Sequence, residues 1–533
     1  MNKILWWVLA VFIFISFATL SRNPLLNDDA ALYALAIKNA ILFHQWLAQF
    51  VTPGDLSSFV DKPPLGIWLL SWFPKFFGIN EYTIHFPNVI YYTLLLLIMY
   101  LTITRISSRK IAFYTTLIAA TSLCLIIYAR APKLDILLTL FVFLAHLSFY
   151  YYLKKTNPLY LYFFTFSLIG GFLVKSGFGL LFPALTILFL FISNARIRKI
   201  VSQAIFSPHF LLCGLLFVFF AGGVLCLQSL ALKEQWFAYL KSIFVQSKYN
   251  SAYLGLGFHY FIISFLLLTI FPWTPLFLTT IKLKFKNLTL NTFCHHWFWS
   301  NILFLLFFYQ QNDLRTFTVF VPPLAILASI RLTSLEKKIS SFKLHNHAFG
   351  EFFWSLFFLI LFASITIVLL FNPVNPKGYS LKSALLPFAL FTFALAIFTF
   401  YLWKPNQTKL VTAFILICFA YSVLFYHTRS IANVFNANLS WPKIIKAYKN
   451  RGWRFYIYRP TNRRLFFSPD LCWVDFMAGP ADKYFWDKNE LQKEIGKKRF
   501  ILLSDTESWN KTKLKSKKIV AQDDYSGLFE VNL

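Results

Sequence analysis

The sequence predicts a mainly α-helical, polytopic membrane protein that carries a small α/β domain near its C-terminal end. Of its 533 residues, 58% are hydrophobic and 14% are charged, whereas about 25% of the residues in an average soluble domain are charged. Apolar runs of 17 or more residues recur along the chain, and each is roughly long enough to cross a hydrocarbon core of about 30 Å as a helix. These observations argue against a soluble enzyme and against a disordered chain.

Thirteen membrane spans are expected from the apolar runs. They cover residues 4–20, 86–101, 111–128, 134–153, 158–174, 177–193, 205–230, 258–280, 297–309, 316–330, 352–371, 381–403 and 411–425. The first span is expected to remain as an uncleaved helix rather than to act as a signal peptide, because no small-residue cleavage site follows it.

The distribution of Lys and Arg predicts how these spans are oriented. If the N-terminus lies inside, seventeen Lys and Arg residues fall in the cytoplasmic loops and six fall in the opposite short connections. Basic residues accumulate on the cytoplasmic side of membrane proteins, so loop 21–85 and the C-terminal tail are expected outside. The formal net charge of +30 is therefore explained by membrane orientation, and no nucleic-acid partner is needed.

Two parts of the chain differ in composition. Residues 1–425 hold the spans, with the polar and aromatic loop 21–85 on the external side. Residues 426–533 are rich in charge and contain short β-like runs at 454–458, 471–476, 500–503 and 528–531, with a helical pattern at 487–495. This pattern predicts a small external domain of α/β type.

Charged residues at the external ends of the spans are the candidate functional groups, because charges at membrane depth are costly. They lie in four short segments, namely Asp28-Asp29, Asp61-Lys62-Pro63-Pro64, Arg130 to Asp135, and Gly170 to Gly177 with Lys175. Each has an ordinary structural alternative. An Asp can cap a helix, Lys62 can be a solvated turn residue, and Lys175 can extend its ammonium group to the membrane surface.

Taken together, these segments place carboxylates and cations on one face of a helical bundle. A carboxylate can orient or deprotonate an acceptor hydroxyl group. Lys and Arg can bind a phosphate group and stabilise it as it leaves. The combination indicates transfer of a group from a phosphate-linked lipid donor at the membrane surface.

The order of these motifs resembles a known family. The matching segments are Asp29-Ala30-Ala31-Leu32-Tyr33-Ala34, Asp61-Lys62-Pro63-Pro64-Leu65-Gly66-Ile67-Trp68, Asp135, Gly171 to Lys175-Ser176-Gly177, Pro272-Trp273, and Arg315 seven residues before Pro322. They resemble the GT-C glycosyltransferases of the dolichyl-phosphate-mannose protein mannosyltransferase type (glycosyltransferase family 39), and most of all the bacterial lipid A aminoarabinose transferases. The resemblance extends over residues 22–325.

The resemblance implies a GT-C transmembrane fold and an inverting glycosyltransferase. Such an enzyme takes a sugar from a polyprenyl-phosphate-linked donor, undecaprenyl in bacteria, and passes it to lipid A or another envelope glycolipid, or less favourably to a protein hydroxyl group. Its expected location is the bacterial inner membrane, with the active site and the C-terminal domain facing the periplasm. Its partners are the lipid-linked sugar, a lipid or glycan acceptor, and membrane lipids.

The same resemblance suggests roles for individual residues. Asp29 is the first candidate for the catalytic carboxylate, Asp135 is the second, and Asp28 adds a neighbouring carboxylate. The expected ligands of the donor phosphate are Lys62, Lys175, Arg315 and Arg130.

No cofactor is required by the motifs, and a divalent metal ion is left as an option. Asp61 and His259 are its candidate ligands, with a hydrogen-bonded histidine at a helix start as the alternative for His259. The chain also departs from the family pattern, since Ala30 replaces a glutamate and Asp61 replaces another. Two other functions therefore stay open: a lipid-linked sugar transporter or flippase, and a non-catalytic membrane assembly factor.

Overall fold

The computed structural model describes part of the chain. The described residues are 7, 9–10, 13–14, 17, 29–50, 62–232, 266, 268–280, 287–308, 314–340, 391–398, 412–413, 416–418, 420, 441–458, 482–485, 488–494, 499–505, 509, 518–522 and 526–531. The chain divides into two compact units. The helical unit comprises Met1–Arg22, Asp61–Leu69 and His85–Ile431, and the second unit comprises Asn23–Val60, Leu70–Ile84 and Ala432–Leu533.

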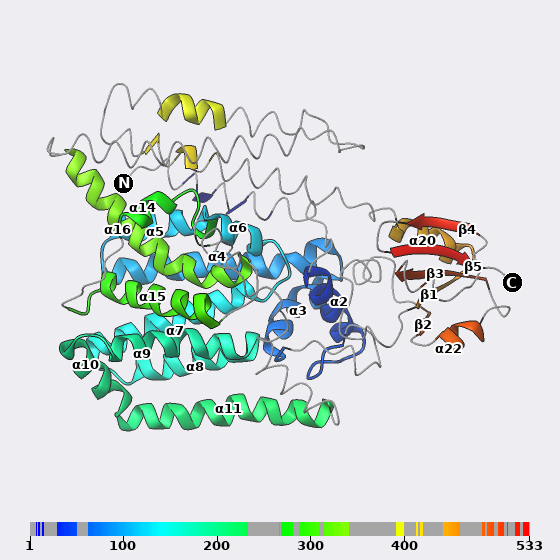
Figure 1. Ribbon diagram of the computed structural model, residues 1–533, viewed down its shortest axis with the longest axis horizontal. Helices are drawn as coiled ribbons and strands as arrows, with labels where there is room; N and C mark the ends of the chain where they lie inside the picture. The colour runs from blue at the N-terminus through cyan, green and yellow to red at the C-terminus, as the bar shows by residue number, and fades with distance from the viewer. Residues whose placement is uncertain are drawn as a thin grey trace. The chain divides into compact units, whose positions relative to one another are not determined.

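The helical unit consists mainly of apolar helices (Figure 1). In chain order its elements are α4 (Glu81–Ile106), α5 (Arg109–Ala120), α6 (Leu123–Ala129), α7 (Asp135–Lys155), α8 (Leu159–Lys175), α9 (Gly177–Phe191), α10 (Ala195–Ile205), α11 (Pro208–Leu232), α14 (Thr274–Leu278), α15 (Leu290–Phe308), the 3-10 helix η6 (Leu314–Phe320) and α16 (Val321–Ser340). Helix α3 (Leu65–Phe77) begins in this unit and continues in the second. Helices α7, α8 and α9 pack against one another, and α15 packs against both α9 and α16.

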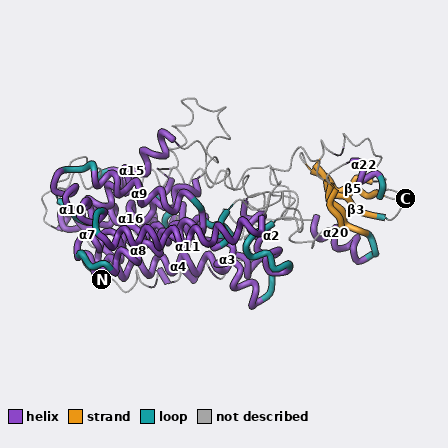
Figure 2. Tube along the Cα trace, turned by 90° about the horizontal axis from the view of Figure 1, so that it is seen from below, coloured by secondary structure: helices purple, strands orange, loops and turns teal. Residues whose placement is uncertain are grey.

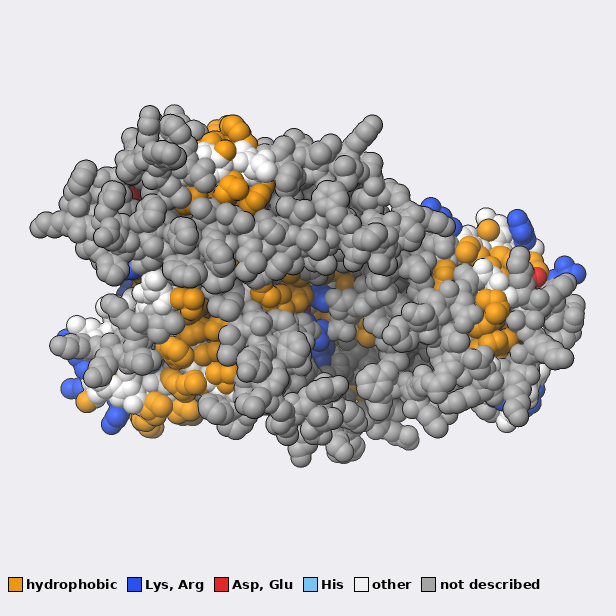
Figure 3. All heavy atoms as spheres, turned by 45° about the horizontal axis from the view of Figure 1, so that its top comes forward, with side chains coloured by type: hydrophobic (Ala, Val, Ile, Leu, Met, Phe, Trp, Pro, Cys, Tyr) orange, Lys and Arg blue, Asp and Glu red, His pale blue; other side chains and the backbone are white. Residues whose placement is uncertain are grey.

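Several of the described helices have the length and apolar character needed to cross a membrane. Within the described residues, α4, α7, α11 and the segment Leu314–Glu336 qualify as spans, and α5 with α6 qualifies as a fifth. Helix α11 leaves apolar side chains such as Leu215, Val218 and Phe219 exposed, as expected of a lipid-facing surface. Among the described side chains in Figure 3, hydrophobic ones form several patches.

The predicted class of an integral, polytopic helical membrane protein is thus confirmed. The number of thirteen spans stays a prediction, because spans such as 352–371 lie outside the described residues.

The expected span 111–128 is not one straight helix. It is divided into α5 and α6, whose axes differ by 61°. At the break, Thr121 and Ser122 turn their hydroxyl groups onto the carbonyl oxygens of Leu117 and Ile118, at 2.7 and 2.5 Å. Hydroxyl groups that bond back to the preceding turn tend to bend helices, which accounts for the division.

Residues 194–204 are the basic loop expected between the spans 177–193 and 205–230, but the structure forms helix α10 over Ala195–Ile205. The Asn194 side chain caps this helix by accepting a hydrogen bond from the Ile197 amide at 3.0 Å. Ile197, Val201 and Ala204 are buried at intervals of three or four residues, so one face of the helix packs inward. The basic residues on the opposite face, Arg196 among them, conceal this pattern in the sequence.

The second unit contains a five-stranded mixed sheet, which Figure 2 shows in orange between two short helices. Its elements are α20 (Trp441–Asn450), β1 (Arg454–Tyr458), β2 (Lys483–Phe485), α22 (Lys488–Gln492), β3 (Phe500–Asp505), β4 (Lys518–Gln522) and β5 (Ser526–Val531). The strand order is β2-β1-β3-β5-β4. Strands β1, β2 and β3 run parallel, whereas β5 is antiparallel to β3 and to β4.

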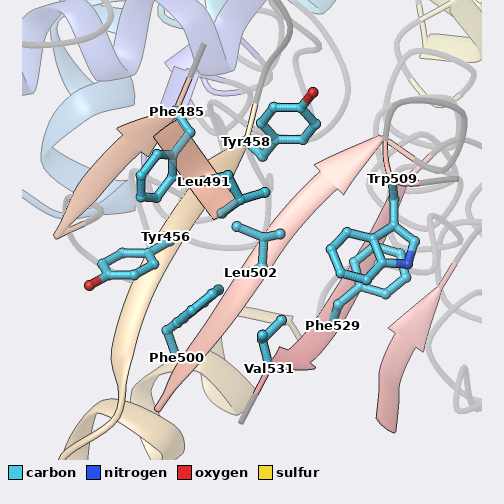
Figure 4. Packing of buried hydrophobic residues seen from close by; sticks show 9 residues of the cluster. All are labelled: Tyr456, Tyr458, Phe485, Leu491, Phe500, Leu502, Trp509, Phe529 and Val531. Atoms are coloured by element: carbon cyan, nitrogen blue, oxygen red, sulfur yellow. The ribbon is translucent and has the colours of Figure 1, made fainter. Parts of the chain in front are cut away.

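Both faces of the sheet are buried. One face holds the aromatic and aliphatic cluster of Figure 4, made of Tyr456, Tyr458, Phe485, Leu491, Phe500, Leu502, Trp509, Phe529 and Val531. On the other face, Phe455 and Ile457 are fully buried, and the Lys449 ammonium group of α20 lies 5.9 Å from the centre of the Phe455 ring. The predicted C-terminal sheet is therefore confirmed, with the run 471–476 outside the described residues.

The second unit also includes α2 (Asp29–Leu42), which lies in the polar loop expected between the first two spans. Most of its side chains are buried, including Lys38 and Asn39. The Asn39 amide donates to the carbonyl oxygen of Phe50 at 3.1 Å and so holds the chain that follows the helix. Lys75 lies 5.0 Å from the centre of the Trp46 ring, which adds a cation–π contact to the same region.

Candidate functional site

Asp135 and Lys175 form a buried ion pair in the helical unit. Lys175 Nζ lies 2.5 Å from Asp135 Oδ1, and the side chains are only 11% and 3% exposed. Asp135 is the first residue of α7 and Lys175 is the last of α8. An anion at a helix N-terminus and a cation at a helix C-terminus are both favoured by the helix dipole, so each helix end supports the charge that it carries.

A single residue, Ser176, separates α8 from α9 and brings Lys175 to this position. The two helices approach closely because they meet at glycines. A Cβ atom added to Gly171 would lie 3.1 Å from Gly179 Cα, and one added to Gly179 would lie 2.0 Å from the carbonyl carbon of Gly171. Small residues of this kind allow helix backbones to pack tightly in membranes.

The connection between α6 and α7 adds two buried cations, Arg130 and Lys133. The Lys133 ammonium group lies 5.2 Å from the centre of the Tyr128 ring. Asn88 of α4 holds this connection in place: its side-chain amide donates to the carbonyl oxygen of Lys133 at 2.8 Å and also to that of Ala131. The ion pair and this connection together contain three cations, Lys175, Arg130 and Lys133, and one carboxylate, Asp135.

The segment that contains Lys62 lies against the same connection. Pro63 and Pro64 are buried and lead into α3, while Lys62 itself is half-buried. A Cβ atom on Gly66 would lie 2.6 Å from a methyl carbon of Leu134, the residue before Asp135. The motif around Lys62 and the motif around Asp135 are therefore in direct contact, as the sequence predicted for segments on one face of the bundle.

Arg315 lies on η6, which packs against α6 and α7. The Arg315 side chain is half-buried, and Cys124 of α6 donates to the neighbouring Leu314 carbonyl oxygen at 3.4 Å. The Pro272-Trp273 motif reaches the same helices. Trp273 is buried, and its indole nitrogen donates to Thr121 Oγ1 at 2.9 Å, at the break between α5 and α6.

Four other predicted site residues are Asp29, Asp28, Asp61 and His259. Asp29 is the first residue of α2 and belongs to the second unit. Asp28, Asp61 and His259 lie outside the described residues. Within the part of the chain that is described, no three His, Cys, Asp or Glu residues are grouped to hold a metal ion. The catalytic and metal-binding roles of these four residues stay predictions.

Two residues of this site were given no role from the sequence: Asn88 was not singled out, and Ser176 was named only as part of the Gly171–Gly177 motif. Asn88 carries a polar amide in an otherwise apolar span, which is the signal that could have found it. Ser176 follows Lys175 and has a backbone φ of 48°, and nothing in the one-dimensional pattern distinguishes it from an ordinary turn residue. Neither residue carries a charge, and each instead fixes the position of a charged neighbour.

The fold and the site define a class: a polytopic membrane protein in which cations and one carboxylate meet where the helices α6, α7, α8 and α9 are connected. Solved structures share this architecture. ArnT from Cupriavidus metallidurans bound to undecaprenyl phosphate superposes with a TM-score of 0.75, with 13% identity, over 99% of this chain and 98% of that chain. The Archaeoglobus fulgidus oligosaccharyltransferase in its apo form gives a TM-score of 0.51, with 11% identity, over 94% of this chain and 69% of that chain.

Sequence comparison agrees with the structural likeness. Residues 61–222 match the family model described as dolichyl-phosphate-mannose-protein mannosyltransferase. An uncharacterized protein of Aquifex aeolicus (strain VF5) is 27% identical over 228 residues, which are 41% of this chain and 44% of that protein. The chain thus spans less than half the length of this relative.

The predicted resemblance is confirmed by these matches. The chain has the GT-C fold of ArnT, and the segment that carries Lys62, Asp135 and Lys175 is similar to the mannosyltransferase family.

Proposed function

We propose that the protein is a membrane-embedded glycosyltransferase that moves a sugar from a polyprenyl-phosphate-linked donor to an acceptor of the cell envelope. The observation that carries this proposal is the Asp135–Lys175 pair, whose Asp135 directly follows the connection that holds the buried cations Arg130 and Lys133. A buried cluster with more cations than carboxylates suits an anionic ligand. The GT-C fold and the undecaprenyl phosphate bound to ArnT support a lipid-linked phosphate as that ligand.

In this proposal the cations bind the donor phosphate and stabilise the leaving group. Lys62, Lys175, Arg130 and Arg315 surround the phosphate and offset the negative charge that develops as polyprenyl phosphate departs. Each of them lies on, or next to, an element that contacts α6 or α7. Preorganised cations of this kind lower the barrier because they need not reorient during the reaction.

The acceptor side of the reaction requires a base. The acceptor hydroxyl oxygen attacks the anomeric carbon of the sugar, and the bond between that carbon and the phosphate oxygen breaks. The bonding electrons leave with the phosphate, and the hydroxyl proton passes to a carboxylate. Asp29 is the proposed base, with Asp28 beside it. Direct displacement inverts the configuration at the anomeric carbon.

Asp135 fits a positioning role better than the role of the base. Its Oδ1 atom is engaged at 2.5 Å by the Lys175 ammonium group, and its side chain is 3% exposed. A buried carboxylate in such a pair holds its partner in one orientation. Asp135 then acts through Lys175, by fixing where that cation meets the phosphate.

The acceptor proposed is lipid A or another envelope glycolipid, and the proposed location is the bacterial inner membrane with the site facing the periplasm. Neither a nucleic acid nor a nucleotide sugar takes part. The proposed steps use the carboxylates and cations of the chain itself, and the candidate metal ligands Asp61 and His259 lie outside the described residues.

Sugar transfer in membranes tests this proposal. The wild-type protein and the Lys175→Met variant are supplied with radiolabelled undecaprenyl-phosphate-linked sugars, with aminoarabinose and mannose first, and the envelope lipids are separated and counted. The variant is expected to lose transfer by about 100-fold or more, because it lacks one cation that stabilises the leaving group. Mass spectrometry of envelope lipids from a strain without the protein identifies the natural product.

A second ion pair supplies the matched control. Lys110 and Glu336 are 2.7 Å apart and lie on α5 and α16, away from the α8–α9 connection. The Lys110→Met variant should transfer sugar at the wild-type rate. Flux of labelled lipid across the membrane without any transfer product would instead favour a flippase, and unchanged envelope lipids in the deletion strain would contradict the enzyme.

A further inference from the structure

Ser176 has an unusual backbone conformation at the connection between α8 and α9. Its φ and ψ angles are 48° and −128°, a region that residues with a Cβ atom rarely adopt. Its amide donates to the Phe172 carbonyl oxygen at 2.7 Å and its own carbonyl accepts from the Gly179 amide at 3.2 Å. The surrounding helices thus hold Ser176 in this conformation.

The hydroxyl group of Ser176 is buried and has no hydrogen-bond partner among the described residues. A serine that precedes a helix normally caps it by accepting a hydrogen bond from the second or third amide. Ser176 makes no such bond. A buried hydroxyl group without a partner is unfavourable, so a ligand that accepts its hydrogen bond would be favoured at this position.

The N-terminus of α9 adds amide donors at the same point. The first amides of an α-helix have no acceptor within the helix, and that end of the helix carries partial positive charge. Helix α9 has 15 residues and starts at Gly177, directly after Ser176. Gly177 is exposed, and a Cβ atom added to it would meet nothing within 4 Å. The space at the Cβ position of Gly177 is therefore open.

The charge next to this space favours an anion. Lys175 precedes Ser176 and is paired with Asp135, whose neighbours along the chain include the buried cations Arg130 and Lys133. Helix N-termini bind phosphate groups in many proteins.

We propose that the Ser176 hydroxyl group and the first amides of α9 form an anion site that binds a phosphate group beside Lys175. The hydroxyl group donates to one non-bridging phosphate oxygen and the α9 amides donate to another. Lys175 neutralises the charge. The identity of the carrier, a polyprenyl chain, rests on the proposed function. The anion site itself is argued from the chemistry of the phosphate group.

Equilibrium binding to the full-length protein in detergent tests the site. Radiolabelled undecaprenyl phosphate is the probe, and unlabelled undecaprenyl phosphate, inorganic phosphate and undecaprenol are the competitors. The Ser176→Ala variant keeps the Cβ atom and the backbone strain but lacks the hydroxyl group. It should bind the probe about 10-fold more weakly, which is the loss expected for one hydrogen bond to a charged group.

Two further variants separate the hydroxyl group from the backbone. Ser176→Gly removes the strain as well as the hydroxyl group, so it should lose affinity as the alanine variant does while melting no lower than the wild-type protein. Ser167→Ala is the matched control, because Ser167 is a buried serine of α8 whose hydroxyl group already donates to the Phe163 carbonyl oxygen at 2.7 Å. Its affinity should equal that of the wild-type protein.

The possible outcomes decide between alternatives. Competition by undecaprenyl phosphate alone supports a lipid-linked phosphate, and equal competition by inorganic phosphate supports the anion site with free phosphate as its ligand. Equal competition by undecaprenol, or unchanged affinity in Ser176→Ala, overturns the inference. A loss in the alanine variant that the glycine variant does not share also overturns it. Wild-type protein that binds the probe through Ser176 but transfers no sugar would refute the proposed function alone.

Discussion

Asp135 and Lys175 are 40 positions apart in the sequence, and their charged atoms are 2.5 Å apart in the structure. The pair joins the start of α7 to the end of α8, and both side chains are largely shielded from solvent. Removal of one partner from a buried pair leaves a charge without compensation, which costs more than the pair itself contributes. The two residues therefore have to be considered together, in stability as well as in activity.

The first prediction concerns this coupling. Lys175→Met and Asp135→Asn are each expected to destabilise the protein by about 3 to 5 kcal/mol, because each leaves a buried group without its partner. The double variant is expected to be less destabilised than the sum of the two. Unfolding in detergent, followed by tryptophan fluorescence, measures all three variants. Additive effects would show that the side chains act independently.

Asn88 supports the second prediction. Its side-chain amide bonds to two backbone carbonyl oxygens of the α6–α7 connection, so Asn88→Ala should loosen Arg130 and Lys133 and reduce sugar transfer, at a stability cost of about 1 to 3 kcal/mol. Thr93→Ala is the control on the same helix, since Thr93 bonds only to Val89 of its own helix among the contacts described. Equal transfer by the two variants would argue against a positioning role for Asn88.

Helix approach at glycine supports the third prediction. A Cβ atom at position 179 would lie 2.0 Å from the Gly171 carbonyl carbon and 2.4 Å from the Phe172 amide nitrogen. Gly179→Ala should therefore push α8 away from α9 and cost about 1 to 3 kcal/mol. Gly177→Ala adds the same methyl group to open space, and its melting temperature should stay close to that of the wild-type protein. Equal melting temperatures for the two variants would contradict the packing described.

The fourth prediction concerns the C-terminal sheet. Tyr448 of α20 donates to Glu530 of β5 at 3.0 Å. Burial first, and then the hydrogen bond to Glu530 and its charge, raise the pKa of Tyr448 above its usual value, with Arg451 acting in the opposite direction. The unfolded chain ionises this phenol near pH 10, before the folded chain does. The stabilisation is therefore complete below about pH 10 and is lost as the pH rises further.

Hydrogen exchange of the full chain measures this effect. Above about pH 10, peptides from α20 and β5 should exchange faster than the intrinsic rise in the exchange rate explains. The Tyr448→Phe variant should not show this additional exchange. At neutral pH the variant should be less stable than the wild-type protein by about 1 kcal/mol, because it lacks the hydrogen bond. Peptides from β2 serve as the internal reference, because Lys483–Phe485 has no contact with Tyr448 among the described hydrogen bonds. An identical pH profile in the phenylalanine variant would contradict the role given to Tyr448.

Much of the architecture could be predicted from local features of the sequence. Apolar runs predict helices in a membrane because only helices and closed barrels satisfy the backbone there, and α7, α8 and α9 start and end within a few residues of the expected spans. Alternating β-type residues likewise identified β1 and β3 in the C-terminal sheet. Helix α10 was missed because its buried face is short and its basic residues resemble those of a loop.

The sequence by itself determined the membrane class, the identity of the charged residues Lys62, Asp135 and Lys175, and their location at the ends of apolar segments. Only the tertiary structure decided that Asp135 and Lys175 pair with each other, that Asn88 holds the connection beside them, and that Ser176 is buried with a φ of 48°. The reason is physical: hydrophobicity and charge act residue by residue along the chain, whereas ion pairing, desolvation and backbone strain depend on which helix ends the packing brings together.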